Sequence, residues 1–268
     1  MIARFLSIGA ALGRWRRRRQ QPRLLALLPF RDEMRYLPGY FRNVPPEVDG
    51  VIALDDGSTD GSSELAASQP SVLDLLRNPP ISSRGNEPHP WNEPENRRRL
   101  IAAAGRHSPC WLVAVDSDER LERGFRERAH AEIARAESAG IAALAVHYRE
   151  LWDAPDTYRA DGLWGSKRRA RLFRYREDAV LDQRALHGPW APLNSKSGGA
   201  FPTADLYLYH LRMLDPDSRR ARRERYERLD PTARYQEIGY AYLTDETGLC
   251  LERLPAGREY EPRGLGDE

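Results

Sequence analysis

Lysine and cysteine are scarce in this chain of 268 residues, and the apolar stretch at its start, residues 1–12, is short. The two cysteines, Cys110 and Cys250, lie far apart and match no metal-binding spacing, which excludes a disulfide framework and a zinc site. We therefore expect reduced thiols in a cytoplasmic protein. The two lysines leave 40 of the 42 basic residues as arginine, which we ascribe to codon usage rather than to function.

The chain also lacks a large net charge, since its formal value at pH 7 is only +2. Nucleic-acid-binding proteins concentrate positive charge, so we expect no nucleic-acid partner. A hydrophobic fraction of 40% and a charged fraction of 31% fit a soluble globular protein. The length predicts one large domain, or one domain with an extension.

Residues 1–22 form a basic leader in which arginines follow the apolar residues. A secretory signal carries its positive charge before the apolar region, and residues 1–12 are too few to span a bilayer. Two interpretations stay open: a disordered leader, or an interfacial helix that contacts headgroups at the inner face of the membrane. We expect a cytoplasmic location in either case.

Apolar runs alternate with helical patterns through the first half of the chain, which is typical of an α/β fold. This alternation predicts a mostly parallel, twisted sheet with helices on both faces. After residue 152 the alternation gives way to aromatic and Gly/Pro-containing segments. Strands are expected over 24–28 (stopped by Pro29), 51–54, 72–76, 111–115, 141–147 and 206–211, and helices over 32–43, from 60, 93–106, 124–139 and 217–229.

Two acidic turns follow directly on two of the predicted strands, and ligands of open α/β sheets bind at such strand ends. In Asp116-Ser117-Asp118 the two carboxylates point to the same side of an extended segment and can hold one Mg²⁺ or Mn²⁺ ion on a diphosphate. In the segment Asp55–Gly61, one of Asp55 and Asp56 is free to accept hydrogen bonds from a ribose or base. The alternatives are a solvated strand end and a plain strand–turn–helix connection.

These motifs, in this order and spacing, resemble those of the family 2 glycosyltransferases of the GT-A fold, over roughly residues 24 to 214. The resemblance rests on residues 29–33 (Pro-Phe-Arg-Asp-Glu), on the Asp-Asp-Gly-Ser-Thr-Asp-Gly turn at 55–61 and on the Asp-x-Asp segment. It implies transfer of a sugar from a nucleotide-diphosphate donor with metal assistance. By position it implies that Arg31 and Glu33 lie near the nucleotide. The chain has Asp32 where the family more often has Asn, which leaves the preferred base open.

The resemblance also implies roles for later residues. It places Asp56 at the base or ribose, and Asp116 and Asp118 at the metal. His210, at the end of the strand predicted over 206–211, is implied as the third metal ligand; a buried core histidine is the alternative for His210. Among the arginines at 97–99, the resemblance implies a contact with the donor phosphate for Arg97 or Arg98. The alternative is that these arginines form a solvated helix face. The catalytic base is a choice between His187, whose imidazole titrates near neutral pH, and Asp182.

The sequence thus predicts three parts: the leader 1–22, a GT-A domain over 23–214 with a nucleotide-binding half (23–120) and an acceptor half (121–214), and a helical C-terminal extension over 215–268. The predicted function is that of an inverting, metal-dependent hexosyltransferase that uses a nucleotide sugar and a glycan, lipid-linked or other hydroxyl acceptor. The alternatives are a non-catalytic nucleotide-sugar-binding relative and a sugar-phosphate nucleotidyltransferase, which normally carries a Gly-rich basic loop after its first strand.

Overall fold

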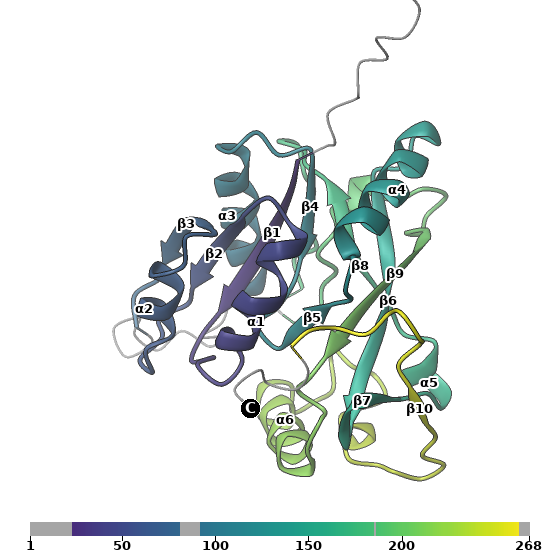
Figure 1. Ribbon diagram of the computed structural model, residues 1–268. Helices are drawn as coiled ribbons and strands as arrows, with labels where there is room; N and C mark the ends of the chain where they lie inside the picture. Colours follow the sequence, from purple (N-terminus) through teal and green to yellow (C-terminus); the bar gives the residue numbers. More distant parts are fainter. Residues whose placement is uncertain (1–22, 81–91, 185, 263–268) are drawn as a thin grey trace, which may run out of the picture.

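The computed structural model describes residues 23–80, 92–184 and 186–262, whose strands form one ten-stranded mixed sheet (Figure 1). In its first half, neighbouring strands run parallel in the order β4-β1-β2-β3. This part confirms the predicted α/β architecture. Its elements are β1 (Leu24–Phe30), α1 (Leu37–Asn43), β2 (Val51–Asp55), α2 (Ser62–Ala67), β3 (Val72–Arg77), α3 (Glu93–Gly105) and β4 (Trp111–Ala114).

The second half adds strands that pair mostly antiparallel, continuing the sheet from β4 in the order β8-β6-β7-β10, while β9 pairs with β5 and β6. Several of these strands were not predicted, because their residues are rich in arginine and show no continuous apolar run. The elements are β5 (Glu119–Leu121), α4 (Phe125–Ser138), β6 (Ala143–Trp152), β7 (Ala154–Arg159), α5 (Gly162–Gly165), β8 (Arg168–Arg174), β9 (Thr203–His210), α6 (Pro216–Leu229) and β10 (Leu251–Arg253).

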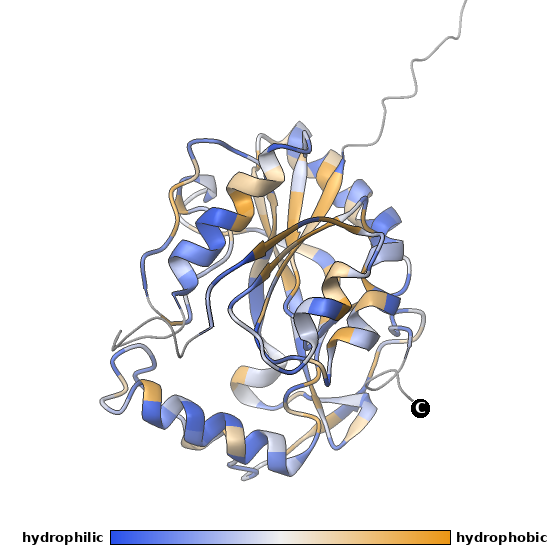
Figure 2. Ribbon diagram, turned by 90° about the vertical axis from the view of Figure 1, so that its left-hand side faces the viewer, coloured by the Kyte–Doolittle hydropathy of each residue, from blue (hydrophilic) through white to orange (hydrophobic). Residues whose placement is uncertain are grey.

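Helices cover both faces of the sheet, as predicted. Alternate residues of β1 point to opposite sides, so Leu24 and Leu28 belong to a core with α1 and α4, whereas Leu25 and Leu27 belong to a core with α3. All residues of β1 are buried, which explains the continuous apolar run in its sequence. Figure 2 shows the apolar strands inside, and α6 at the bottom, hydrophilic along most of its length.

Several predicted boundaries are wrong; the strand expected over 141–147, for example, is β6, which begins at Ala143 and runs to Trp152. β1 does not stop at Pro29 but continues to Phe30; its pairing with β4 ends at Leu27, so the missing N–H of Pro29 interrupts no bond to that neighbour. The helix predicted over 32–43 begins only at Leu37. The residues before it form a turn in which Asp32 has a φ of 52° and its carboxylate accepts a 2.8 Å hydrogen bond from the N–H of Thr59. The segment after β1 is thereby tied to the acidic turn after β2.

The segment predicted as a helical extension contributes α6 but also β10, which pairs with β7, and Tyr260, which packs on Tyr209. No helix in the described part of the chain is long and apolar enough to cross a membrane. The leader 1–22, with its predicted membrane contact, and residues 81–91, before α3, lie outside the described residues. Both cysteines, Cys110 and Cys250, are free and exposed.

Candidate functional site

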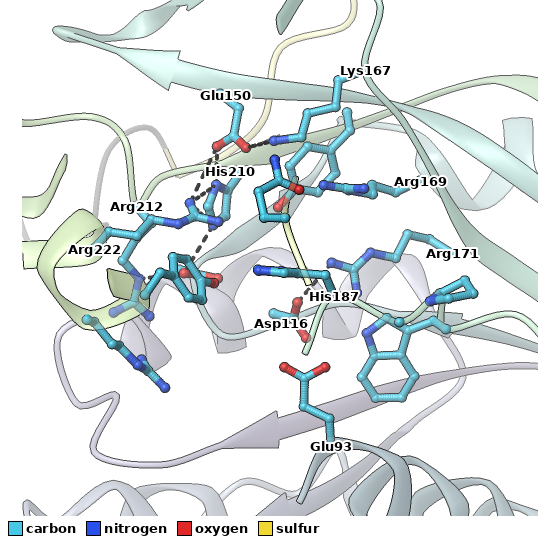
Figure 3. Close-up of a pocket in the computed structure, with 18 of the residues that line it drawn as sticks. Glu93, Asp116, Glu150, Lys167, Arg169, Arg171, His187, His210, Arg212 and Arg222 are labelled. Atoms are coloured by element: carbon cyan, nitrogen blue, oxygen red, sulfur yellow. Dashed lines mark hydrogen bonds and ion pairs between the residues drawn. The ribbon is translucent and has the colours of Figure 1, made fainter. Parts of the chain in front are cut away.

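A cavity of about 820 Å³ opens beyond the ends of β1 and β4, between these strands, β8 and α6. Ten arginine and lysine side chains and six aspartate and glutamate side chains line it, so charged groups dominate the surface that a ligand would meet. Figure 3 shows this cavity, with Asp116 and Glu93 below, Arg169 and Arg171 on one side and His210, Arg212 and Arg222 on the other. Its position agrees with the ligand-binding edge of open α/β sheets.

The two carboxylates of the Asp-x-Asp segment are both paired with arginine. Asp116 Oδ2 accepts a 2.8 Å hydrogen bond from Nη2 of Arg171 on β8, and Asp118 Oδ2 accepts one of 2.6 Å from Nε of Arg212. Burial alone would raise the pKa of Asp118, but Arg212 and His210 hold it well below its ordinary value. Asp118 is therefore ionised throughout the physiological pH range.

His210, the last residue of β9, lies between two carboxylates. Its Nε2 is 3.2 Å from Oδ2 of Asp118, and its Nδ1 contacts Oε2 of the buried Glu150 on β6. Burial opposes protonation of the ring, but Glu150 and Asp118 outweigh it and raise the pKa of His210. Lys167 contacts the other oxygen of Glu150, and burial lowers the pKa of Lys167 to about 8.

The predicted metal ligands are assembled in part. In an octahedral Mn²⁺ or Mg²⁺ site each metal–ligand bond is about 2.1 Å long, so two neighbouring ligand atoms lie about 3 Å apart. The 3.2 Å between Nε2 of His210 and Oδ2 of Asp118 matches this spacing. Asp116, the third predicted ligand, faces Arg171 instead. Within the described residues, no group of three or more His, Cys, Asp or Glu side chains is gathered around one point. Oxygen and neutral imidazole donors suit Mn²⁺, so the Asp118–His210 pair fits such an ion once His210 loses the Nε2 proton that its raised pKa favours.

The residues predicted to meet the nucleoside lie beside the cavity rather than on its surface. Asp55, the last residue of β2, accepts a 2.8 Å hydrogen bond from the N–H of Ser58 and so shapes the turn. Asp56 is fully buried and accepts bonds from Nδ2 of Asn78 at 2.5 Å and from Nη1 of Arg31 at 3.4 Å. None of these five residues lines the cavity, so a direct nucleoside contact of Asp56 stays a prediction.

Of the other donor-side candidates, Glu33 and Arg97 line the cavity and Arg98 does not. Glu33 accepts a 2.5 Å hydrogen bond from Nη2 of Arg212, and burial raises its pKa. Arg97 is buried on α3, pairs with Glu93 and lies with its guanidinium 5.3 Å from the ring centroid of Trp190. Arg98 points to the exposed face of α3, where it pairs with Glu95.

The structure separates the two candidates for the catalytic base. His187 lines the cavity, with its Nε2 3.1 Å from the hydroxyl of Tyr240 and a φ of 61°, a strained value for a residue other than glycine. Burial and the nearby Arg169 and Arg222 lower its pKa to about 4, so the imidazole is neutral at pH 7. Asp182 lies outside the cavity lining, and its carboxylate accepts bonds from the backbone and side chain of Arg184.

Sequence reasoning missed several charged residues of the cavity. Glu150 and Lys167 occur where no motif marks them, and their pairing depends on the register between β6 and β8. The alternation of Arg169 and Arg171 could have been found, because residues two apart on a strand share a face. The missed charged residues of the cavity are Arg35, Glu93, Glu150, Lys167, Arg168, Arg169, Arg171, Arg184, Arg212, Arg222 and Arg225.

No family model matches the chain. Its sequence is similar to two uncharacterised proteins, one from Mycobacterium bovis and one from Mycobacterium tuberculosis, each 28% identical over 273 residues. The match covers 91% of this chain and 65% of each relative, so the chain spans about two thirds of their length.

Among solved structures, the chain is similar to TarS from S. aureus, with a TM-score of 0.45 and 13% identity over 76% of this chain and 40% of that one. It is also similar to glucosyl-3-phosphoglycerate synthase from Mycobacterium tuberculosis, which was crystallised with Mn²⁺, uridine diphosphate and glucosyl-3-phosphoglycerate. That match has a TM-score of 0.33 and 20% identity over 48% of this chain and 44% of that one. With TM-scores below 0.5, these likenesses assign no role to any residue of the cavity.

Proposed function

We propose that this chain is a glycosyltransferase that moves a sugar from a nucleotide-diphosphate donor to an acceptor hydroxyl. The observation that carries the proposal is the meeting of Asp118 with His210 at 3.2 Å inside an arginine-lined cavity at the carboxyl ends of parallel strands. Carboxylate, imidazole and guanidinium groups in one site suit a diphosphate ligand. The resemblance of the three sequence motifs to family 2 glycosyltransferases supports the same reaction.

Within this proposal, the donor diphosphate lies over the Asp-x-Asp segment. Asp118 and His210, with Asp116 as the third candidate, would hold a divalent ion there, and the ion would supply charge neutralisation for the leaving diphosphate. Arg171 and Arg212 now pair with the two aspartates, and a diphosphate offers them alternative oxygen partners. Arg97 adds a buried guanidinium on the α3 side of the cavity.

His187 is the proposed base. The acceptor oxygen forms a bond to the anomeric carbon while His187 takes the hydroxyl proton. The bond between that carbon and the diphosphate oxygen breaks, and its electron pair leaves with the diphosphate. One displacement of this kind inverts the anomeric configuration. A neutral imidazole that lines the cavity suits this task better than Asp182, which lies outside it.

A sugar-phosphate nucleotidyltransferase is the less favoured alternative, because the residues between β1 and α1 form no Gly-rich basic loop. A non-catalytic nucleotide-sugar-binding protein has the same cavity but no turnover. Release of sugar from a nucleotide-sugar donor in the presence of Mn²⁺ therefore separates the two classes of function.

Thermal-shift titration with uridine and guanosine diphosphate, with and without Mn²⁺, tests the site directly. We expect a metal-dependent rise in melting temperature that Asp118→Ala abolishes. Asp178→Ala is the matched control, since Asp178 is exposed and, among the described residues, its carboxylate pairs with Arg176. Absence of any nucleotide-dependent shift in the wild-type protein would reject the proposed function, and a shift that persists in Asp118→Ala would reject the assignment of the ion to Asp118.

A further inference from the structure

The cavity carries more positive charge than a nucleotide sugar needs. Its ten arginine and lysine side chains exceed its six carboxylates by four, and still by two when Arg35 and Arg184 are set aside, which pair with Asp215 and Asp182 outside the lining. The whole chain has a net charge of only +2. The diphosphate of a nucleotide sugar carries two negative charges, and any divalent ion bound with it reduces that demand further. The surplus therefore points to a second anionic group in the same cavity.

Most of the cations lie on β8, on the residue before it and on α6. Lys167 precedes β8, and Arg169 and Arg171 lie on it, so these three residues share one strand face. Figure 3 shows their side chains one below another, directed toward Arg212 and Arg222 on the other side. Arg225 lies three residues after Arg222 on α6, and both line the cavity.

Two of these cations have no carboxylate partner. Lys167 and Arg222 face Glu150, and Arg171 pairs with Asp116. In contrast, Arg169 and Arg225 donate no hydrogen bond and form no ion pair with any described residue; Arg169 only lies over the ring of Tyr148, at 5.8 Å. Two such guanidinium groups on elements more than fifty residues apart in sequence are free to bind an oxyanion.

The pair reaches from the acceptor side of the cavity to the donor side, because Arg225 is close enough to Glu33 to oppose the rise in the pKa of Glu33. Arg169 is close enough to His187 to help lower the pKa of its imidazole, so the free guanidinium and the proposed base face the same space. The donor-side residues, Glu33 and Asp118, are connected through Arg212. An anion on Arg169 would therefore lie beside the acceptor hydroxyl.

We propose that the acceptor carries a phosphate or carboxylate group, which Arg169 of β8 and Arg225 of α6 bind while a neighbouring hydroxyl group of the same molecule receives the sugar. This inference rests on the proposed function, because it assigns the acceptor of that reaction. A free phosphate ester and a lipid phosphate headgroup have the same recognised chemistry.

Calorimetric titration of the full chain tests the inference in two steps. Uridine or guanosine diphosphate with Mn²⁺ is titrated first, and glycerol 3-phosphate is then titrated into the nucleotide-loaded protein, with glycerol as the uncharged comparison. We expect glycerol 3-phosphate to bind and glycerol not to bind. The double variant Arg169→Gln/Arg225→Gln should weaken this binding by about tenfold per arginine and keep the nucleotide affinity within the same order of magnitude.

Arg220→Gln/Arg228→Gln is the matched control, because both arginines are on α6 and outside the cavity lining. Binding to phosphatidylglycerol vesicles, compared with phosphatidylcholine vesicles, tests the lipid source. If the protein binds phosphatidylglycerol but not glycerol 3-phosphate, and only the cavity double variant loses this binding, the anion is a lipid headgroup. If the nucleotide binds but neither phosphate probe does, or if both double variants behave alike, the inference is wrong and the proposed function stands. If no nucleotide binds, the proposed function itself fails.

Discussion

Nε2 of His210 lies 3.2 Å from Oδ2 of Asp118, although the two residues are 92 positions apart in the sequence. The register of the sheet brings them together, because β5 pairs antiparallel with β9 and places Glu119 opposite His210. Glu150 of β6 contacts the other ring nitrogen and so orients the imidazole. The second half of the chain thus completes a site that begins at the acidic turn of the first half.

We expect Glu150→Gln to destabilise the fold, because Glu150 is buried and contacts both Lys167 and His210. The amide keeps the shape but removes the charge between two buried cations. Loss of one partner from a buried charge network should lower the free energy of unfolding by about 3 kcal/mol, measured by urea denaturation. Glu227→Gln, which removes the exposed partner of Arg223, is the control and should cost less than about 0.5 kcal/mol. Equal effects of the two substitutions would contradict the role of Glu150.

We expect His187→Gln to lower kcat by about 10²–10⁴-fold without a matching loss of nucleotide affinity, because the proposed base acts on the acceptor hydroxyl. Steady-state kinetics with a nucleotide-sugar donor and calorimetry with the nucleotide measure the two quantities. Because the pKa of His187 is about 4, the wild-type kcat/KM should not fall near pH 6.5 but only as the pH approaches 4.

Asp182→Asn is the comparison for the base, since Asp182 was the other candidate and lies outside the cavity lining. We expect this substitution to leave kcat within the same order of magnitude. A large loss of kcat in Asp182→Asn together with normal turnover in His187→Gln would reverse the assignment.

The parallel half of the fold could be predicted from sequence because its signals are local. The buried strands β1, β2 and β4 are short apolar runs, and each is followed by turn or helix-starting residues. The strand β8 could not be predicted in this way. Its residues Arg168–Arg174 read as a charged segment, and they form a strand because their arginines find carboxylates and aromatic rings on other elements.

The same distinction explains the site. Asp116 and Asp118 were recognisable as a pair because their spacing is local, and His210 because it ends an apolar strand. That Asp116 pairs with Arg171 rather than joining Asp118 and His210 depends on the antiparallel register between β4 and β8. Sequence spacing carries no information on that register, so the charge partners of the cavity had to come from the structure.

We expect His147→Phe to make stability less dependent on pH. His147 on β6 stacks on Tyr207 at a centroid distance of 4.7 Å. Burial lowers the pKa of His147 to about 4, and the positive charges of Arg168, Arg149 and Arg258 act in the same direction. Asp205 opposes this effect in part. The folded pKa lies below the unfolded value of about 6.5, so the unfolded state binds more protons between these values. The stabilisation is complete above about pH 6.5 and declines as the pH falls toward 4.

Melting temperatures of the wild type and His147→Phe, measured from pH 7.5 down to about 4.5, check this sign. Phenylalanine keeps the ring stacking and removes the titrating group, so the variant should gain stability relative to the wild type as the pH falls. Parallel curves for the two proteins would show that His147 contributes nothing to the acid sensitivity.

Arg219 should anchor α6, the helix that carries Arg222 and Arg225 to the cavity. Its guanidinium lies 4.1 Å from the ring centroid of the fully buried Trp152 and donates a 2.9 Å hydrogen bond to the carbonyl of Met213. We expect Arg219→Met to lower the free energy of unfolding by about 2–3 kcal/mol in urea denaturation, through loss of a desolvated cation–π contact and of hydrogen bonds from a charged group.

Lysine at position 219 should restore only part of this stability, because an ammonium group cannot stack on Trp152 as a planar guanidinium does. Arg220→Met is the control, since Arg220 is the next residue of α6, is exposed and, within the described part of the chain, pairs with Asp217. It should change the unfolding free energy by less than about 0.5 kcal/mol. If Arg219→Met also weakens binding of glycerol 3-phosphate to the nucleotide-loaded protein while Arg220→Met does not, the position of α6 determines the anion site. Unchanged binding in a destabilised Arg219→Met protein would show that α6 keeps its place without this contact.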